Sequence, residues 1–173
     1  MYKSKFTLHN KTLAMEKTAS TEHKSAFKII LLTGFIAGTL DGTAATIQFL
    51  IKGGKDPGRI FKYISSAVFG PDAYNGGFPM ILSGVVFHYI IAYSLTLFFF
   101  LIYPKMPILA KNKYITGICY GIFAWIVTTQ IIVRLSLLKP VFHLDQAIIA
   151  MLILIAMIGL PISILANRFY SKK

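Results

Sequence analysis

Long apolar runs separated by short polar segments make up the chain after its first 26 residues. Each run reaches the roughly 20 residues that a helix rising about 1.5 Å per residue needs to cross about 30 Å of hydrocarbon. The pattern predicts four membrane-spanning helices, at residues 27–51, 80–103, 114–138 and 147–166. Helix-ending signals follow the first and third runs, as Lys52-Gly53-Gly54 and Lys139-Pro140.

The segment between the first two runs is amphipathic over residues 56–70. Its apolar positions share one face of a helix, at Ile60, Phe61, Ile64, Ala67 and Val68. Arg59, Lys62 and Ser66 lie off that face. This predicts an interfacial helix in the first outer loop.

The predicted fold is all-α: an integral membrane four-helix bundle over residues 27–168, with the amphipathic interfacial helix added. Residues 1–26 are basic and polar without a sustained helical period, which predicts a polar arm. Residues 169–173 form a short basic tail. Asp145 is predicted to cap the start of the fourth helix.

Composition supports a membrane location. The 173 residues are 55% hydrophobic and 14% charged, and a soluble fold of this size could not bury that much apolar surface. The net charge of +12 could suggest nucleic acid, but the lysines and arginines sit at the ends of the apolar runs. Membrane lipid is therefore the predicted partner, and nucleic acid is not.

The distribution of positive charge predicts the orientation. Of the 18 Lys and Arg residues, 12 lie on the side of the two termini and 6 on the other. Cytoplasmic segments carry the excess of positive charge, so we expect both termini in the cytoplasm.

Polar residues inside the runs are the candidate functional groups. Asp41 lies about 16 Å below Lys52 by helix rise, where an aspartate costs about 2.5–3.5 kcal/mol unless other helices shield it. Polar residues of the second and third runs fall at a similar depth or one turn nearer the outer side. We predict an intramembrane polar cluster of Asp41, His88, Gln130 and Arg134.

Two interpretations of this cluster stay open. A structural clamp would fix how the helices align, each polar group satisfying another. A proton or ion relay would use the coupled titration of a carboxylate beside an imidazole in a medium of low dielectric constant.

Small residues predict where helices approach one another. Gly34, Gly38 and Gly42 are spaced by four in the first run, and Gly117 and Gly121 repeat the spacing in the third. Such spacing favours close helix contact in lipid, either within the bundle or between copies of the chain. In the fourth run, the region around Pro161 is predicted to be kinked.

No residue pattern supports catalysis, a cofactor or a metal site. The lone Cys119 excludes an internal disulfide, and His143 with Asp145 is too small a set for a metal. We expect no catalytic residues, no cofactor and no metal. A lipid-modifying enzyme is a remote alternative because no catalytic group faces the amphipathic segment.

Several short segments resemble a family of small bacterial four-span membrane proteins. They are the run Gly38-Thr39-Leu40-Asp41-Gly42, residues 64–70, the Gly76-Gly77 pair and the spacing from Gly84 to His88. The resemblance covers about residues 30–105. It implies a multi-pass protein of the bacterial cytoplasmic (inner) membrane and importance of Asp41 and His88, but that family has no assigned activity.

The expected function is a non-enzymatic accessory or scaffold component with a buried polar cluster. It would act alone, as a homo-oligomer or with a membrane-protein partner, in contact through the glycines of the first run. The alternative is a small ion or proton transporter or channel acting as an oligomer, because four spans enclose little volume beyond their own side chains.

Overall fold

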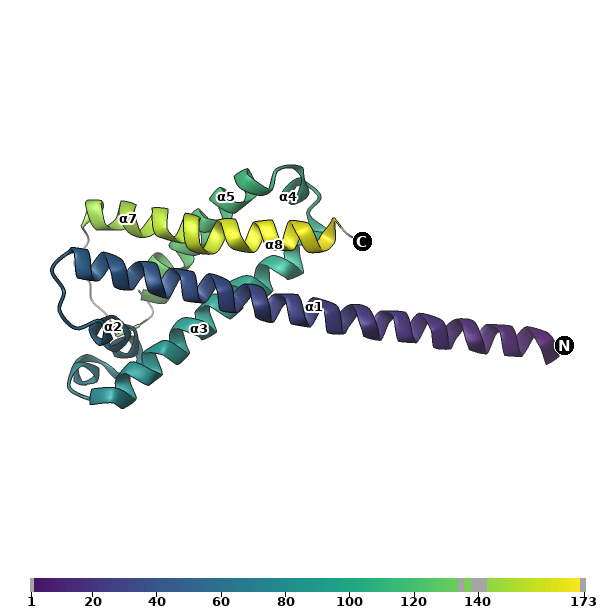
Figure 1. The fold of residues 1–173 in the computed structure, drawn as a ribbon, viewed down its shortest axis with the longest axis horizontal. Coiled ribbons are helices and arrows are strands. Elements are labelled where there is room, and N and C mark those ends of the chain that lie inside the picture. Colours follow the sequence, from purple (N-terminus) through teal and green to yellow (C-terminus); the bar gives the residue numbers. More distant parts are fainter. Residues whose placement is uncertain (1, 134–135, 138–142, 172–173) are drawn as a thin grey trace.

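The computed structural model is a set of helices joined by short turns (Figure 1). It describes residues 2–133, 136–137 and 143–171, with side chains from Ser25 onward. Its main helices are α1 (Tyr2–Ile51), α2 (Gly58–Phe69), α3 (Gly77–Ile102), α4 (Ile108–Lys111), α5 (Lys113–Ile126), α7 (Leu144–Leu154) and α8 (Leu160–Tyr170). Shorter helical segments are η1 (Pro71–Tyr74), η2 (Tyr103–Lys105), η3 (Val127–Ile132) and η4 (Ile155–Gly159). These ranges contain no strand, so the all-α prediction is confirmed.

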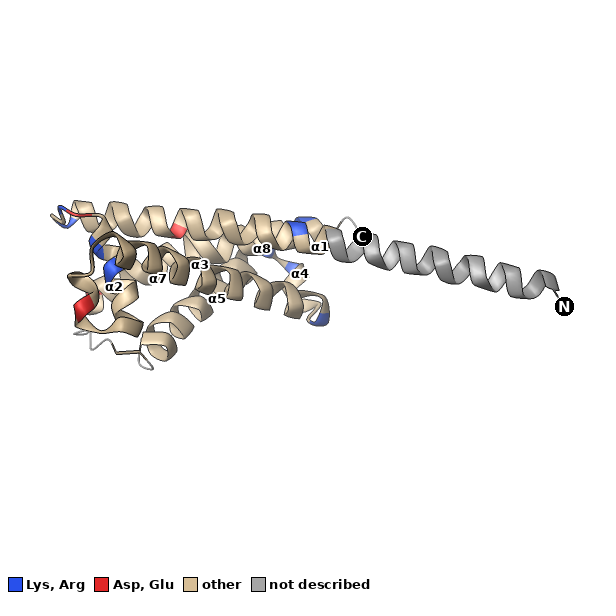
Figure 2. Cartoon of the chain, turned by 90° about the horizontal axis from the view of Figure 1, so that it is seen from below, with Lys and Arg blue, Asp and Glu red and all other residues tan. Residues whose placement is uncertain are grey.

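Four helical stretches are long and apolar enough to cross a membrane. They are Ser25–Ile51, Gly77–Lys105, Lys113–Ile132 and Leu144–Tyr170. Charged residues gather at the two ends of these stretches, and the middle is nearly free of them (Figure 2). The protein is therefore a multi-pass membrane protein built on a four-helix bundle.

Three helix boundaries differ from the sequence prediction. Residues 136–137 form a bend, so the third span is shorter than the predicted 114–138. Helix α7 begins at Leu144 and its N-cap is His143, which places Asp145 in the first turn rather than at the cap. At the other end of the chain, α1 begins at Tyr2, although residues 1–26 carry no sustained helical period. Once a helix is nucleated, each further residue adds a hydrogen bond, so a polar segment can prolong it.

Helices α1 and α3 pack along the glycine stripe of α1. A Cβ added at Gly34 would overlap the ring of Tyr93, and one at Gly38 would lie 3.0 Å from Tyr89 Cε1. At Gly42 it would lie 3.1 Å from His88 Nε2. The stripe therefore accommodates aromatic and imidazole rings of the same chain.

The hairpin of the third and fourth spans has an even closer contact. A Cβ at Gly121 would lie 2.9 Å from the nitrogen of Ile155, and one at Gly117 would lie 3.0 Å from Leu160 Cα. Gly159 faces both of these glycines. Backbone meets backbone here because none of the three has a side chain.

Both helices of this hairpin contain a π-helical segment. The fourth span runs through η4 into α8, with Pro161 in the first turn of α8. In the third span η3 follows α5, and the hydroxyl of Thr129 donates to the carbonyl of Trp125 at 2.6 Å. The wider π-helical turn accommodates a proline, which lacks an N–H donor. Hydrogen bonds from threonine hydroxyls to the preceding turn bend a helix.

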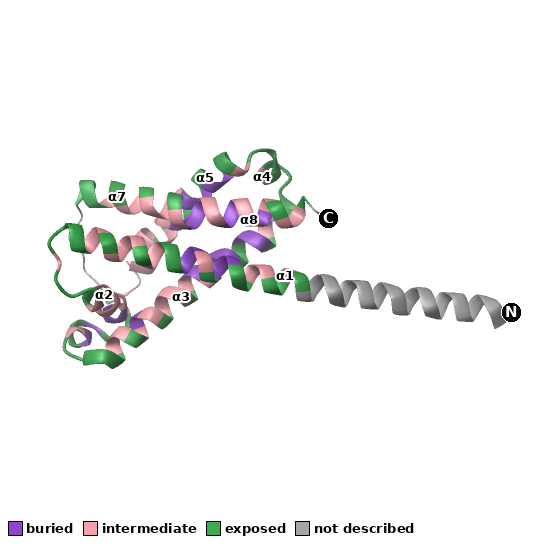
Figure 3. Cartoon of the chain, in the orientation of Figure 1, coloured by how far each residue is buried: buried purple, intermediate pink, exposed green. Residues whose placement is uncertain are grey.

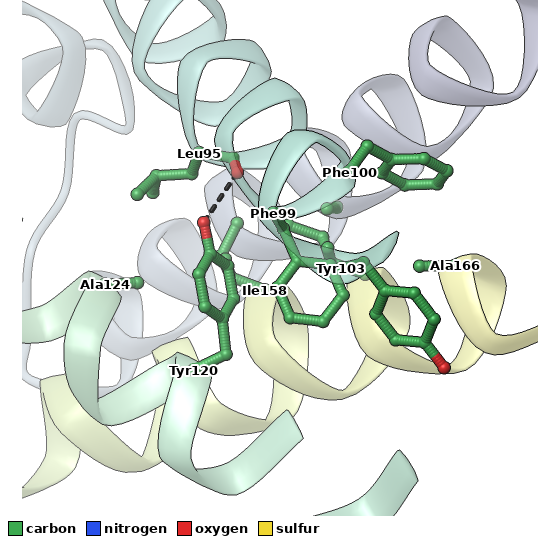
Figure 4. Packing of buried hydrophobic residues seen from close by; sticks show 10 residues of the cluster. Leu95, Phe99, Phe100, Tyr103, Tyr120, Ala124, Ile158 and Ala166 are labelled. Carbon is green, nitrogen blue, oxygen red and sulfur yellow. Dashed lines mark hydrogen bonds between the residues drawn. The ribbon is translucent and has the colours of Figure 1, made fainter. Parts of the chain in front are cut away.

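The buried core lies where α1, α3, α5, η4 and α8 meet (Figure 3). Phe99 is fully buried, and its ring lies 4.5 Å from that of Tyr120 in an edge-to-face arrangement (Figure 4). The hydroxyl of Tyr120 donates to the Leu95 carbonyl at 2.6 Å. Nearer the termini, Tyr103 stacks on Tyr170.

Tyr120→Phe should weaken the core without changing its shape. The substitution removes the hydroxyl that bonds Leu95, and interhelical hydrogen bonds in membranes contribute about 0.6 kcal/mol on average. We expect a fall of about 1–2 °C in Tm in detergent. Tyr114→Phe is the matched control because Tyr114 is exposed at the start of α5; an equal fall in the control would contradict the role of this hydrogen bond.

Helix α2 lies between α1 and α3 at the wide end of the bundle (Figure 1). A Cβ at Gly84 would overlap the carbonyl of Phe61, so α3 and α2 touch through their backbones. The hydroxyl of Ser65 donates to the Met80 carbonyl at 2.5 Å. Ser66, predicted to lie off the apolar face, is buried, and Val68 is 56% exposed. Small serines allow this close approach. Of the five residues predicted on the apolar face of α2, Val68 is exposed and the other four are half-buried, so that face turns inward except at Val68.

Candidate functional site

Asp41 lies in the middle of the first span and lines a central cavity of about 240 Å³. Helix α1 supplies Asp41, Ala45 and Gln48 to the wall of this cavity, one or two turns apart. Side chains of α2, α3, η3, α7 and η4 complete it. The carboxylate therefore faces the interior of the bundle, where neighbouring spans shield it from lipid.

The cavity ends on the hydrophobic core. Leu95 and Ile158 belong both to the cavity wall and to the buried core cluster. The rings of Phe99 and Tyr120 pack together (Figure 4), and Phe99 lies one turn beyond Leu95 toward the Ile102 end of α3. The central cavity is therefore closed toward the end of the bundle where the termini lie.

At its other end the central cavity adjoins a second, outer cavity of about 400 Å³. Ala45 and Gln48 line both cavities. The outer cavity lies where α1 ends, between Lys52, Arg59 of α2 and Gln146 of α7. Gln48 thus lies on the wall between the outer cavity and the central cavity that Asp41 lines.

His88 reaches across from α3 to the backbone of α1. Its Nε2 lies 2.8 Å from the carbonyl oxygen of Gly38. A carbonyl can only accept, so Nε2 carries the hydrogen and donates it in this bond. The missing side chain at Gly42 leaves room for this ring.

His88 separates the central cavity from a groove on the outer face of the α1–α3 pair. The groove has a volume of about 300 Å³, and Thr39, Thr43 and Thr46 line it together with His88. The hydroxyl of Thr39 lies 2.8 Å from that of Tyr89. His88 therefore borders both the central cavity and this groove.

Asp41 and His88 share the central cavity without bonding each other. Both side chains line the same cavity, but no hydrogen bond or ion pair joins them in the part of the chain that the structure describes. Asp41 thus keeps its oxygens for water, a proton or a ligand. With Gln48 and Thr128, the site offers polar partners at one end of a largely apolar cavity.

The third span contributes Thr128 to the cavity wall, and Gln130 is not among its lining residues. The Thr128 hydroxyl donates to the Ala124 carbonyl at 2.8 Å, which leaves its oxygen free to accept. Both residues lie in η3, whose wider turn changes the direction of every side chain after Ile126. Arg134 lies outside the described residues.

Sequence reasoning missed Gln48, which lines both cavities. Its position seven residues after Asp41 places it on the same helical face, two turns nearer the outer side. This spacing of seven residues from Asp41 was the sequence signal that could have identified Gln48.

Within the described ranges no three His, Cys, Asp or Glu side chains come together as a metal site would require. His143 and Asp145 are exposed at the start of the fourth span, and Cys119 is exposed on α5. The chemistry of the site therefore rests on one carboxylate, one imidazole and neutral polar groups.

Comparison of the sequence with protein-family models and with curated proteins finds no match. Comparison of the fold with solved structures finds none either.

Proposed function

We propose that this protein is a non-enzymatic proton transporter in which Asp41 and His88 exchange a proton with the outer side of the membrane. The observation that carries the proposal is that a carboxylate in mid-membrane faces a cavity adjoining an outer one through Gln48. Intramembrane carboxylates and histidines that face such cavities are typical of proton pathways.

A proton suits this route better than a metal cation. A metal cation such as Ca²⁺ needs six or more oxygen ligands, and the central cavity offers one carboxylate with the side chains of Gln48 and Thr128. A proton can pass along water and neutral side chains, and the cavity of about 240 Å³ exceeds the roughly 30 Å³ that one water occupies in the liquid. His88 lines the same cavity as Asp41, so water in this cavity can carry a proton between the two side chains.

The single chain is sufficient for proton uptake from the outer side. The central cavity lies between the four spans and α2, so access to Asp41 does not require an oligomer. Release toward the termini requires the packing around Leu95 and Ile158 to loosen, since both residues close the cavity floor. Alternating access of this kind is the usual working principle of small carriers.

An accessory or scaffold role has less support. Its contact surface was expected at Gly34, Gly38 and Gly42, but these glycines pack against rings of α3 in the same chain. Association of two copies or with a partner would have to use another surface.

We place the protein in the bacterial cytoplasmic membrane with both termini in the cytoplasm. Support comes from the sequence resemblance and from the 12 of 18 positive charges on the side of the termini. In this orientation the cavities open toward the outside.

The test is proton flux in liposomes that contain the purified protein and a pH-sensitive dye. A potassium gradient with valinomycin supplies the driving voltage. We expect uptake by the wild type, background uptake by Asp41→Asn, and an intermediate rate for His88→Gln. Asp72→Asn, the same change at an exposed carboxylate, should match the wild type.

Melting temperature in detergent separates transport from a structural clamp. Asn has almost the shape of Asp, so Asp41→Asn should keep its Tm within about 3 °C of the wild type if the carboxylate serves transport. Wild-type flux no greater than that of empty liposomes, or equal flux in wild type and Asp41→Asn, would overturn the proposal. Absence of flux together with a large fall in Tm for both variants would establish the clamp instead.

A further inference from the structure

We propose that the outer cavity is a binding site for a phosphate-bearing anion, the chemistry shared by phospholipid headgroups and free phosphate. The cavity has a volume of about 400 Å³ and lies at the end of the bundle where α1 ends and α7 begins. Lys52 and Arg59 line it from two different elements. The inference does not depend on proton transport, because it rests on these two cations and their surroundings.

The backbone fixes both cations at the cavity. Lys52 ends the helical hydrogen bonding of α1, donating its N–H to the Gln48 carbonyl at 3.1 Å. Gly53 follows with φ +86°, a conformation that favours glycine and turns the chain away. Arg59 lies in the first turn of α2, and its guanidinium lies 5.7 Å from the centre of the Tyr74 ring.

Neither cation has an acidic partner among the described residues. The cavity wall contains no Asp or Glu. The nearest acid in the chain, Asp56, accepts a hydrogen bond from the N–H of Gly58 at 2.9 Å, which anchors the start of α2. Asp72 is exposed on η1 and does not line the cavity. Two positive charges therefore stand uncompensated beside a membrane interface, where basic pockets bind anionic headgroups.

Neutral donors complete the wall. The amides of Gln48 and Gln146 and the hydroxyls of Tyr63 and Tyr74 line the same cavity. Burial, with the nearby Tyr74, raises the pKa of Tyr63 above its usual value, so its phenol stays protonated and can donate. Arginine binds phosphate oxygens through paired N–H groups, and lysine adds a point charge, so the set fits a phosphate better than a halide.

The experiment uses the full chain in nanodiscs of neutral phosphatidylcholine. One arm replaces a fraction of the lipid by phosphatidylglycerol, and bound lipid is measured by native mass spectrometry. The other arm adds inorganic phosphate and follows Tm. We expect retention of phosphatidylglycerol, a rise in Tm with phosphate, or both; lipid alone would identify a headgroup site and phosphate alone a site for the free anion.

The variants compare charge at the cavity with charge beside it. Lys52→Gln with Arg59→Gln should weaken binding at least about tenfold, since each phosphate contact contributes strongly to anion affinity. Lys55→Gln with Lys62→Gln removes the same net charge from residues that do not line the cavity, and should leave affinity within about twofold. Lys52→Gln alone leaves the contact between Arg59 and the Tyr74 ring in place, so it tests the site even if the double variant misfolds. It should lose part of the affinity that the double variant loses.

Two results would overturn the site. One is the absence of both lipid retention and phosphate response in the wild type. The other is an equal loss of affinity in the two double variants, which would indicate general attraction to a basic surface. Absence of proton flux in the wild type would overturn the transport proposal and leave anion binding at Lys52 and Arg59 unaffected, so the two proposals are tested separately.

Discussion

Gly159→Ala is expected to separate the third and fourth spans. The new methyl group would overlap the Gly117 carbonyl and lie 2.6 Å from the nitrogen of Gly121. These are backbone atoms of the neighbouring helix, so no side-chain rotation can relieve the contact. Overpacking of this kind costs about 3 kcal/mol, which corresponds to a fall of about 6–12 °C in Tm in detergent.

Gly76→Ala is the matched control for this prediction. Gly76 has an ordinary φ of −77°, and a Cβ there would meet atoms of the flexible Met80 side chain alone. Its Tm should stay within about 2 °C of the wild type. A Gly159→Ala protein as stable as the control would mean that the two spans do not make this backbone contact.

Phe99→Ala is expected to leave a cavity at the centre of the bundle. Phe99 is fully buried, and its ring packs against those of Tyr103 and Tyr120 (Figure 4). In a membrane the unfolded helices already lie in hydrocarbon, so the lost transfer free energy is small and the cost comes from lost packing. A cavity on the order of 100 Å³ costs about 2 kcal/mol, or about 4–8 °C in Tm.

Phe98→Ala makes the same chemical change one residue earlier. Phe98 is 44% exposed and points outward, with its ring stacked on Phe123 at 5.5 Å. We expect a fall of less than about 3 °C, because lipid can fill the space that the ring leaves. Equal losses for the two variants would show that the core is not centred on Phe99.

The amphipathic helix shows what sequence periodicity can and cannot predict. Apolar spacing over residues 56–70 predicted a helix, and α2 spans Gly58–Phe69. The spacing also predicted its apolar face, yet Ser66 is buried and Val68 is exposed. Close approach of α2 to Gly84 favours small side chains at this contact, and hydropathy does not measure the space between two backbones.

The sequence also predicted only some of the residues of the candidate site. Asp41 stood out because a carboxylate in mid-membrane must be shielded, and His88 because its depth matched. Thr128 and Gln48 line the cavity with them, although depth alone had favoured Gln130 in the third span. The depth of a residue in the membrane follows from counting residues along the helix. The direction of its side chain around the helix axis depends on the local winding, which differs in the π-helical segment η3.

The sequence by itself determined the membrane location, the number of spans and the depth of each polar residue. It could do so because hydrocarbon accepts only helices with satisfied backbones and apolar surfaces, and both requirements can be counted along the chain. Only the tertiary structure decided which side chains meet, since glycine contacts and π-helical turns set the rotation of each helix. That rotation brings Asp41 and His88 to one cavity and turns the glycine stripe of α1 toward α3.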